Sequence, residues 1–340
     1  MSMKAAATVA VTGIGGFVGR HVALLLLRRG YDVRGTVRSL ARAEEIERSI
    51  RAAGGTDLAQ LTFAEADLLG EGGWAEAFAG ASYVMHTASP FPARLPADEA
   101  ELIGPARDGT LRVLQAARSS GVRRVVLTSS VAAVIYGPGS APFTEDDWTD
   151  PHSPLATPYY RSKTFAERAA WDYAAANGLE LAVVNPGMVL GPLLGREIGT
   201  SVAVVRNLLS GGYPALPKFS VPVVDVRDVA DAHLRAMTVD GAAGERFLVA
   251  GETLSLADMA SILRRQCPEY AAKLPKFILP NWLAGLAAPF DAGLRLIVGE
   301  LGRDSRISNE KARRVLGWQP RAAEEAVMAS AESLIGAGLV

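Results

Sequence analysis

Short apolar runs alternate with helical patterns over the first 185 residues of the chain. The runs predict strands at residues 8–12, 31–38, 61–66, 83–88, 124–129 and 181–185. Between them, apolar residues recur with helical spacing at residues 17–29, 40–53, 106–119 and 158–176. Strands that are separated by helices run parallel in one sheet. The pattern therefore predicts an α/β fold, with a doubly wound parallel sheet of the Rossmann type.

The pattern loosens after residue 186, where glycine and proline interrupt short segments. The elements predicted there are a strand at 223–226, a helix at 229–237, a seventh strand of the large sheet at 246–250 and a mainly helical remainder. We expect a Rossmann domain made of residues 1–186 and about 223–250. Residues 187–222 and 251–340 would form a smaller, mainly helical substrate lobe that is woven into the first domain.

The composition favours a protein that acts on small molecules. The 340 residues carry a formal net charge of -1, so nothing in the charge balance favours nucleic acid or an anionic membrane. The single cysteine, Cys267, forms no internal disulfide, and we expect a cytoplasmic protein. An apolar stretch at 277–298 is broken by prolines and charges, which favours the wall of a pocket over a membrane span. The four histidines lack the spacing of metal ligands, so we expect no metal.

Three glycines follow the first predicted strand and open the first predicted helix. Gly13 permits a tight turn, Gly16 lets a pyrophosphate approach the backbone, and Gly19 lets the helix pack on the strand. The amino end of the helix then faces the negative phosphates. This arrangement predicts a dinucleotide-binding site.

The second predicted strand ends in an arginine, Arg38, where a carboxylate would bind the ribose hydroxyls of NAD. An arginine suits the additional phosphate of NADP. Arg42, one helical turn later, would add a second cation, and Asp32 lies at the opposite end of the strand. We therefore expect NADP, with NADPH as the reduced form.

A tyrosine and a lysine, Tyr159 and Lys163, lie four residues apart and share one face of a predicted helix. A cation beside a phenol lowers the pKa of the phenol from its ordinary value of about 10. We expect Tyr159 to transfer a proton near neutral pH. Ser130, at the end of the fifth predicted strand, would donate to a carbonyl, with Ser129 as the alternative. Tyr160 rivals Tyr159 but lacks the four-residue spacing.

Together these features resemble the extended short-chain dehydrogenases/reductases, and within them the dihydroflavonol reductase-like branch with its microbial aldehyde and ketone reductases. The matching segments are the glycine loop at 12–19, Thr-Ser-Ser at 128–130, the Tyr/Lys segment at 158–167, Asn-Pro-Gly at 185–187, and segments 224–233 and 316–320. The resemblance implies a Rossmann fold, NADP, a small-molecule carbonyl substrate and a monomer or homodimer.

The resemblance also implies roles for single residues. Tyr159 would be the acid/base, Lys163 would hold the cofactor ribose, and Ser130 would polarise the carbonyl. The residues implied at the cofactor are Thr12, Gly13, Gly15, Gly16, Phe17, Val18, Arg38, Asp67, Leu68, Thr87, Ala88, Ser89, Lys163, Pro186, Gly187 and Met188. Those expected to contact the substrate are Phe91, Ile135, Tyr159 and Val189.

Two positions depart from the pattern of the family. Many relatives carry an asparagine in the helix before the fifth strand, where it supports a proton relay. This chain has Pro-Ala-Arg-Asp-Gly-Thr at 105–110, and whether Asp108 replaces the asparagine is open. Plant flavonoid enzymes read ring hydroxyls with a polar residue where this chain has the apolar Ile135. We therefore expect an apolar or aromatic aldehyde or ketone in place of a dihydroflavonol.

Three other functions fit part of the pattern. A nucleotide-sugar epimerase or dehydratase shares the fold and the Tyr/Lys pair, but needs polar groups for a diphosphate in the second lobe. A steroid-type alcohol dehydrogenase runs the same chemistry in reverse. An NADP-sensing binding protein has no need of Ser130, Tyr159 and Lys163. The sequence thus favours an NADPH-dependent carbonyl reductase.

Overall fold

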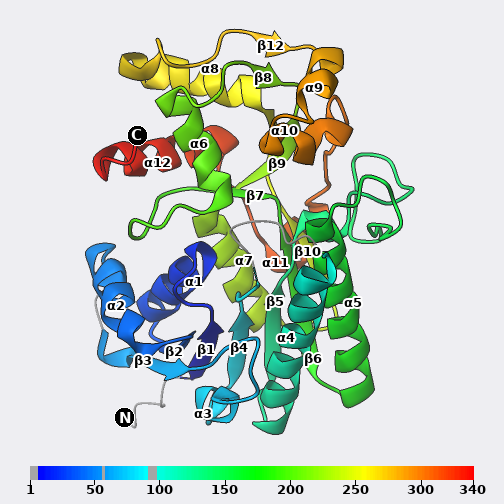
Figure 1. Cartoon of the computed structure of the whole chain (residues 1–340). Helices are drawn as coiled ribbons and strands as arrows, with labels where there is room; N and C mark the ends of the chain where they lie inside the picture. Colours follow the sequence, from blue (N-terminus) through cyan, green and yellow to red (C-terminus); the bar gives the residue numbers. More distant parts are fainter. Residues whose placement is uncertain (1–6, 56–57, 91–97) are drawn as a thin grey trace.

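The computed structural model describes residues 7–55, 58–90 and 98–340 (Figure 1). The strands of its large sheet are β1 (Thr8–Thr12), β2 (Asp32–Val37), β3 (Leu61–Glu65), β4 (Tyr83–His86), β5 (Arg124–Thr128), β6 (Glu180–Pro186) and β10 (Arg246–Val249). Among the described residues these seven strands are all parallel, in the order β10-β6-β5-β4-β1-β2-β3. The predicted doubly wound parallel sheet is confirmed, and the order of the strands reverses between β1 and β4.

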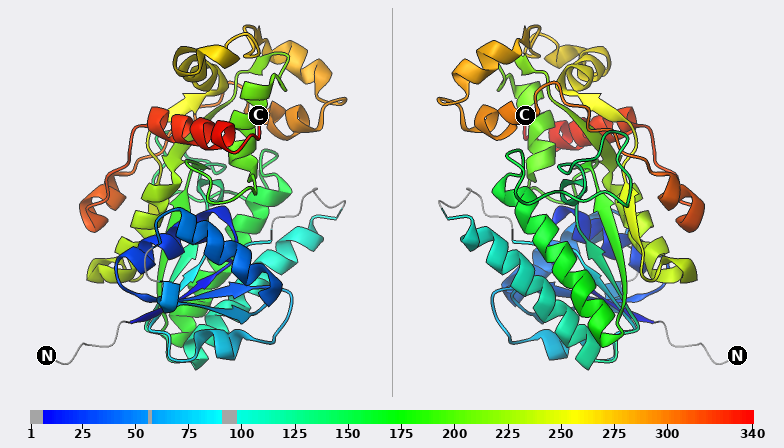
Figure 2. Two further views of the ribbon diagram at one scale, coloured as in Figure 1. Left: turned by 90° about the vertical axis from the view of Figure 1, so that its left-hand side faces the viewer. Right: turned by 90° about the vertical axis from the view of Figure 1, so that its right-hand side faces the viewer.

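Helices cover both faces of this sheet (Figure 2). One face packs against α1 (Phe17–Arg28), α2 (Ala43–Ala52) and α7 (Val226–Thr238), and the other against α3 (Trp74–Phe78), α4 (Ala100–Ser119) and α5 (Pro158–Asn177). Successive residues of β1 point to opposite faces of the sheet. Val9 and Val11 belong to the apolar core under α1, α2 and α7, and Ala10 belongs to the core under α3, α4 and α5. Burial on both faces explains why the inner strands β1, β4, β5 and β6 are largely apolar, whereas the edge strand β3 is partly exposed.

Some predicted helix ends are wrong by several residues. Helix α4 begins at Ala100 instead of residue 106 and continues through Pro105. A proline removes one backbone hydrogen bond, but Leu102 and Ala106 lie on one buried face and hold the turn against the core. Helix α7 begins at Val226 because the carboxylate of Asp225 caps it by accepting from the Arg227 amide.

A smaller second lobe lies over the carboxyl ends of the large sheet (Figure 1). Its helices are α6 (Thr200–Ser210), α8 (Leu256–Gln266), α9 (Asn281–Ala287), α10 (Ala292–Ile297) and α12 (Ala323–Gly336). Helix α11 (Glu310–Leu316) packs instead against α7 and β10, in the core of the large sheet. Its strands are β7 (Met188–Leu190), β8 (Leu216–Pro217), β9 (Ser220–Asp225), β11 (Thr253–Ser255) and β12 (Ile278–Leu279). The strand that the sequence predicts at 223–226 is β9, which pairs with β7 and β11 and not with the large sheet.

The apolar stretch at 277–298 is only partly buried. Phe277 is 76% exposed, Trp282 is 70% exposed and Phe290 is 92% exposed, so these large side chains face solvent. In the part of the chain that the structure describes, no helix has both the length and the apolar character that crossing a membrane requires.

Candidate active site

The turn between β1 and α1 has the geometry that the glycine pattern predicts. Gly13 has a φ of +67°, and a Cβ there would lie 2.8 Å from the Cα of Ala88. A Cβ at Gly19 would overlap the carbonyl oxygen of Gly13. Gly16 is the exposed N-cap of α1, so no side chain of its own covers the first amides of the helix. The turn therefore fits a pyrophosphate against the helix terminus.

Threonine side chains join the carboxyl ends of β1, β2 and β4. The Thr87 hydroxyl donates to the Thr12 carbonyl at 2.6 Å, and the Ala88 amide donates to the Thr12 hydroxyl at 3.2 Å. The Gly13 amide donates to the Thr36 hydroxyl at 3.3 Å. Four of the predicted cofactor residues thus lie together at the edge where ligands bind in such sheets.

Other predicted cofactor residues follow the neighbouring strand and helix. Asp67 comes after β3, and its carboxylate accepts from the Leu69 amide at 3.0 Å. The Leu68 carbonyl accepts from the Arg112 guanidinium of α4 at 2.8 Å. Phe17 and Val18 occupy the first turn of α1, half-buried against the apolar cores. Their contact with a cofactor stays a prediction.

The two candidate phosphate-binding arginines have different surroundings. Arg38 follows β2 and is exposed. Arg42 reaches over the glycine turn, with a guanidinium nitrogen 3.6 Å from where a Cβ of Gly15 would lie. Arg42 is paired with Glu197 of the second lobe at 2.5 Å and with Glu45 at 3.6 Å. Arg38 is therefore the better candidate for the phosphate, because Arg42 already has two carboxylate partners.

Ser130, Tyr159 and Lys163 meet at the carboxyl edge of the sheet. Tyr159 and Lys163 occupy the first turns of α5, and the lysine ammonium lies 6.0 Å from the centre of the tyrosine ring. Ser130 follows β5 and hydrogen-bonds to Tyr159. Lys163 donates to the Ser89 hydroxyl at 3.1 Å, which places it beside a predicted cofactor residue.

The contacts distinguish Ser130 from Ser129. The Ser129 hydroxyl is buried and donates to the carboxylate of Glu167 at 2.5 Å. Ser130 is half-buried, and its oxygen accepts from the Ala132 amide at 3.1 Å. The engagement of Ser129 with Glu167, together with the Ser130–Tyr159 hydrogen bond, favours Ser130 as the serine that faces a substrate.

Tyr160 has a different set of partners from Tyr159. Its ring stacks on Tyr136 with the ring centres 4.1 Å apart and the planes 9° from parallel. Its hydroxyl donates to the carboxylate of Glu300 at 2.6 Å. Tyr160 is thus committed to a contact with the second lobe, which leaves Tyr159 as the candidate acid/base.

The expectation that the pKa of Tyr159 lies below its ordinary value is wrong for this structure. Burial raises the pKa of Tyr159, and the hydrogen bond with Ser130 opposes that shift. Burial also lowers the pKa of Lys163 to about 8, against the attraction of Glu167. Burial is the larger of the two effects on Tyr159. Tyr159 therefore keeps its proton at neutral pH, as a proton donor must.

Sequence reasoning missed the central part that Glu167 plays. This side chain is 1% exposed, and its carboxylate accepts from Ser129 and, at 2.7 Å, from Asn185. It also pairs with Arg246 at 2.8 Å, and so joins β5, β6 and β10 to α5. The sequence does offer one indication of this role, because Glu167 lies one helical turn after Lys163 on the same helix.

A small cavity of about 10 Å³ lies behind Lys163. It is lined by Ala88, Ser89, Ala106, Thr110, Leu127, Thr128, Ser129, Lys163, Ala166 and Glu167. Its volume is close to that of one water molecule, and hydroxyl, ammonium and carboxylate groups line it. Thr110 faces this cavity, whereas Asp108 pairs with Arg107 at 2.8 Å. The two residues of α4 thus have different surroundings.

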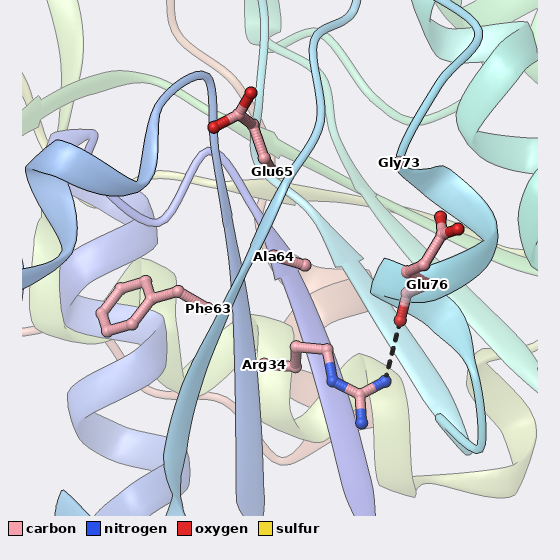
Figure 3. A pocket seen from close by; sticks show the side chains of 6 residues that line it. All are labelled: Arg34, Phe63, Ala64, Glu65, Gly73 and Glu76. Atoms are coloured by element: carbon pink, nitrogen blue, oxygen red, sulfur yellow. Dashed lines mark hydrogen bonds between the residues drawn. The ribbon is translucent and has the colours of Figure 1, made fainter.

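A wider cleft of about 560 Å³ lies elsewhere, between β2, β3 and α3 (Figure 3). It is lined by Arg34, Phe63, Ala64, Glu65, Gly73 and Glu76. The Arg34 guanidinium donates to the Glu76 carbonyl at 3.2 Å. In Figure 3 the Glu65 carboxylate points away from the Arg34 guanidinium. None of these residues belongs to the predicted site, so size alone does not locate the chemistry.

The residues expected near the nicotinamide and substrate form the crossing from the large sheet to the second lobe. Pro186 ends β6, and Gly187 follows it before β7. A Cβ at residue 187 would overlap the Pro222 carbonyl oxygen, which explains why this residue is a glycine. Met188 and Val189 are half-buried in β7. Ile135 is 3% exposed, so it fills an apolar cluster in this structure, and Phe91 lies outside the described residues.

Known proteins are similar to this chain in sequence and in fold. The model of the NAD dependent epimerase/dehydratase family matches residues 9–250. Cinnamoyl-CoA reductase CAD2 of Medicago truncatula is 38% identical over 270 residues, which cover 76% of this chain and 81% of that protein. A putative NADPH-dependent methylglyoxal reductase, GRP2 of Candida albicans, is 32% identical over 344 residues, covering 93% and 95%.

A solved structure agrees with these sequence matches. Yeast methylglyoxal/isovaleraldehyde reductase Gre2, crystallised with NADPH, superposes with a TM-score of 0.80 and 27% identity over 98% of this chain and 100% of that one. The match includes the second lobe as well as the large sheet. The resemblance found from the motifs is thereby confirmed, and the chain belongs to the NAD-dependent epimerase/dehydratase family of extended short-chain dehydrogenases/reductases.

Proposed function

We propose that this protein is an NADPH-dependent reductase that converts an apolar or aromatic aldehyde or ketone to an alcohol. The observation that carries the proposal is the meeting of Ser130, Tyr159 and Lys163 at the carboxyl edge of the sheet, beside the glycine turn after β1. Relatives that are named as carbonyl reductases support it. The proposal therefore assigns the acid/base chemistry to these three residues and the cofactor to the same edge.

The chain's own residues supply the acid/base part of the reaction. NADPH, when bound, supplies the hydride that adds to the carbonyl carbon. Tyr159 gives its proton to the carbonyl oxygen, so that the product is a neutral alcohol. The Ser130 hydroxyl donates to the same oxygen and stabilises the negative charge as it develops. Lys163 stabilises the tyrosinate that remains until a proton returns from solvent.

The preference for NADPH rests on Arg38. An arginine at the end of β2 suits the additional phosphate of NADP, because its planar fork matches phosphate geometry. Arg38 is exposed, so its guanidinium is open to solvent. The NADPH named for the yeast and Candida relatives supports the same choice.

The substrate class follows from the residues at the other end of the predicted site. Met188 and Val189 present apolar side chains where the large sheet passes into the second lobe. Such a wall favours substrates with an apolar group next to the carbonyl. Isovaleraldehyde, named for yeast Gre2, is a carbonyl of this kind, whereas methylglyoxal, named for the same protein, is more polar.

NADPH oxidation with a panel of carbonyls tests the proposal. The panel contains methylglyoxal, isovaleraldehyde, aromatic aldehydes and ketones, and each is run with NADPH and with NADH. We expect turnover with NADPH that is highest for apolar aldehydes or ketones. The absence of turnover with every carbonyl, in a protein that demonstrably binds NADPH, would contradict the proposal.

Reduction of an acyl-CoA thioester is the second candidate, because the relatives at 38% identity are named cinnamoyl-CoA reductases. Hydride transfer to the thioester carbonyl would break the carbon–sulfur bond and release the CoA thiol with an aldehyde. Cinnamoyl-CoA is therefore included in the panel, with free thiol measured alongside NADPH. Release of one thiol per NADPH, faster than aldehyde reduction, would favour this candidate.

An epimerase or dehydratase remains distinguishable by its cofactor. Such an enzyme regenerates its NAD within each cycle and retains it during purification. We expect the denatured protein to release no stoichiometric NAD. Stoichiometric release of NAD would favour the epimerase or dehydratase over the reductase.

A further inference from the structure

We propose that Glu300 is a positioning residue that fixes Ser130 and Tyr159 relative to each other. The inference rests on the proposed carbonyl reduction, in which both residues act on one oxygen. Glu300 belongs to the second lobe, at the end of the short 3-10 turn η6 (Val298–Glu300). It lies more than 100 residues from the catalytic tyrosine in sequence, yet the fold brings the two regions together.

The Glu300 carboxylate bridges two tyrosines. One oxygen accepts from the Tyr136 hydroxyl at 2.6 Å and the other from the Tyr160 hydroxyl at 2.6 Å. The two rings stack with their centres 4.1 Å apart and their planes 9° from parallel. Glu300 itself is 7% exposed. Each phenol therefore has a fixed direction, set both by the stack and by the carboxylate.

The two tyrosines belong to the two segments that carry the catalytic groups. Tyr160 is the neighbour of Tyr159 in the first turn of α5, and their ring centres lie 5.9 Å apart. Tyr136 lies on the segment that begins with Ser130, the N-cap of the 3-10 turn η3 (Val131–Ala133). One carboxylate from the second lobe thus holds both segments at the distance from which Ser130 and Tyr159 share an oxygen.

Arg303 secures the bridge from the side of Tyr136. Its guanidinium lies 4.7 Å from the centre of the Tyr136 ring and donates to the Ile135 carbonyl. Its positive charge also favours the ionised form of Glu300, against the burial that raises the pKa of that group. Loss of either phenol would leave a carboxylate oxygen buried without its partner, which is costly. The bridge therefore needs both tyrosines.

The position of Tyr159 depends on this contact because the residue lies in the first turn of its helix. Amides of a first turn have no partner from a preceding turn, so neighbouring contacts decide how the turn is held. A displacement of about 1 Å at a catalytic group lowers turnover about 100-fold. A small shift of Tyr160 would move Tyr159 with it, while the cofactor turn after β1 would stay in place.

Removing single hydroxyl groups tests the proposal. Tyr136→Phe and Tyr160→Phe each keep the ring stack and break one hydrogen bond to Glu300. We expect kcat to fall about 10- to 100-fold in each variant, with the KM for NADPH within about twofold. The double variant should resemble the single ones, because both hydroxyls act through one carboxylate. Tyr173→Phe, on the same helix but away from the bridge, is the matched control and should retain wild-type kcat.

Deuterium exchange of the full chain gives a second reading that needs no activity. In both variants and in Glu300→Gln, we expect faster exchange in peptides that cover residues 130–136 and 158–164. Exchange in a peptide from α4, residues 107–117, should stay unchanged. Wild-type kcat in both tyrosine variants, or faster exchange of all three peptides together, would overturn the proposal.

The two readings separate this proposal from the proposed function. If the wild-type protein reduces no carbonyl, the proposed function fails whatever the variants do. The exchange comparison then decides the bridge alone: faster exchange confined to the two segments supports it, and unchanged exchange overturns it.

Discussion

The burial of Tyr159 keeps its proton in place. Burial raises the pKa of its phenol, and the Lys163 ammonium lies 6.0 Å from the centre of its ring. A proton donor with a raised pKa stays protonated across the neutral pH range and gives up its proton only when an alkoxide develops nearby. At the scale of single residues, a protonated Tyr159 is what the proposed reduction of a carbonyl requires.

Lys163 should give the reaction an alkaline limit. Burial lowers the pKa of this lysine to about 8, with Glu167 opposing the shift. As the pH rises through about 8, Lys163 loses the charge that stabilises the tyrosinate, so kcat should fall. The measurement is kcat at saturating NADPH between about pH 6 and pH 10. A constant kcat across this interval would contradict the role of Lys163.

Arg38 should determine the choice between the two nicotinamide cofactors. Arg38→Ala removes a charged partner of the additional phosphate of NADP, and a hydrogen bond to a charged group contributes about 1.5–3 kcal/mol. The KM for NADPH should therefore rise about 10- to 100-fold, while the KM for NADH changes little. Steady-state kinetics with both cofactors measures this. Arg48→Ala, at an exposed position of α2, is the control. Equal increases for both cofactors would reject the assignment.

The sequence predicts part of this site and misses part of it for a physical reason. The Tyr159–Lys163 pair follows from helical spacing, which is local. The roles of Ser129 and Glu300 depend on partners 38 and 140 or more residues away. The direction of the Tyr159 pKa also depends on burial, which spacing alone does not reveal. Only the folded chain shows which neighbouring hydroxyl faces the site.

At the scale of secondary structure, the turn between β1 and α1 is the proposed cofactor site. A residue with a Cβ at the φ of +67° found at Gly13 costs about 1–2 kcal/mol. The Cβ would also lie too close to Ala88. The turn and the residues that follow β4 would have to shift together. A substitution at Gly13 therefore tests whether the shape of the whole turn matters for cofactor binding.

Gly13→Ala should therefore weaken NADPH binding at least about 10-fold, since a loss of about 1.4 kcal/mol corresponds to a factor of 10. Fluorescence titration of NADPH measures the Kd. Gly72→Ala, at a position with open space around it, should leave the Kd unchanged. Unchanged NADPH affinity in Gly13→Ala would show that the turn does not hold the cofactor.

Elements with long apolar runs are predicted well, and short elements are not. Strands β1 to β6 lie within two residues of their predicted bounds, because most of them are buried apolar runs and β2 alternates apolar with polar residues. Strands β7, β8, β11 and β12 have two or three residues, too few for an alternation to be recognised. The start of α4 is also missed, since Pro105 indicates a helix boundary in the sequence whereas the core holds the helix through it.

Buried histidines should make the whole fold sensitive to acid. Burial lowers the pKa of His21 to about 4, of His86 to about 3 and of His233 to about 4. The unfolded chain binds protons on these groups below their ordinary pKa of 6.5, while the folded chain does not. Stability is therefore present above pH 6.5 and is lost as the pH falls towards 4, by about 1.4 kcal/mol per pH unit for each histidine.

Urea unfolding at about pH 7 and pH 5 measures this loss. We expect the unfolding free energy to fall by about 2 kcal/mol per buried histidine between these conditions. His233→Gln should reduce the dependence on pH, whereas His152→Gln, at an exposed loop position, should not. The same dependence on pH in His233→Gln as in the wild-type protein would contradict the assignment.

At the scale of the whole molecule, several contacts join the cofactor edge of the sheet to the second lobe, and two of them lie beside the proposed site. Arg42 beside the glycine turn pairs with Glu197, and Tyr160 beside the acid/base binds Glu300. The likeness to yeast Gre2 extends over 98% of this chain, so this arrangement of sheet and lobe is shared across the fold. The proposed carbonyl reduction and the proposed role of Glu300 therefore both concern the carboxyl edge of the large sheet.

The turnover of Tyr159→Phe tests the central claim most directly. The substitution removes one hydroxyl and leaves the ring, the helix and the glycine turn intact. With the best carbonyl of the panel and saturating NADPH, we predict that kcat falls at least about 100-fold, because general acid catalysis contributes about that much or more. The Kd for NADPH should stay within about twofold of the wild-type value. A kcat near the wild-type value would show that another group supplies the proton and would contradict the account.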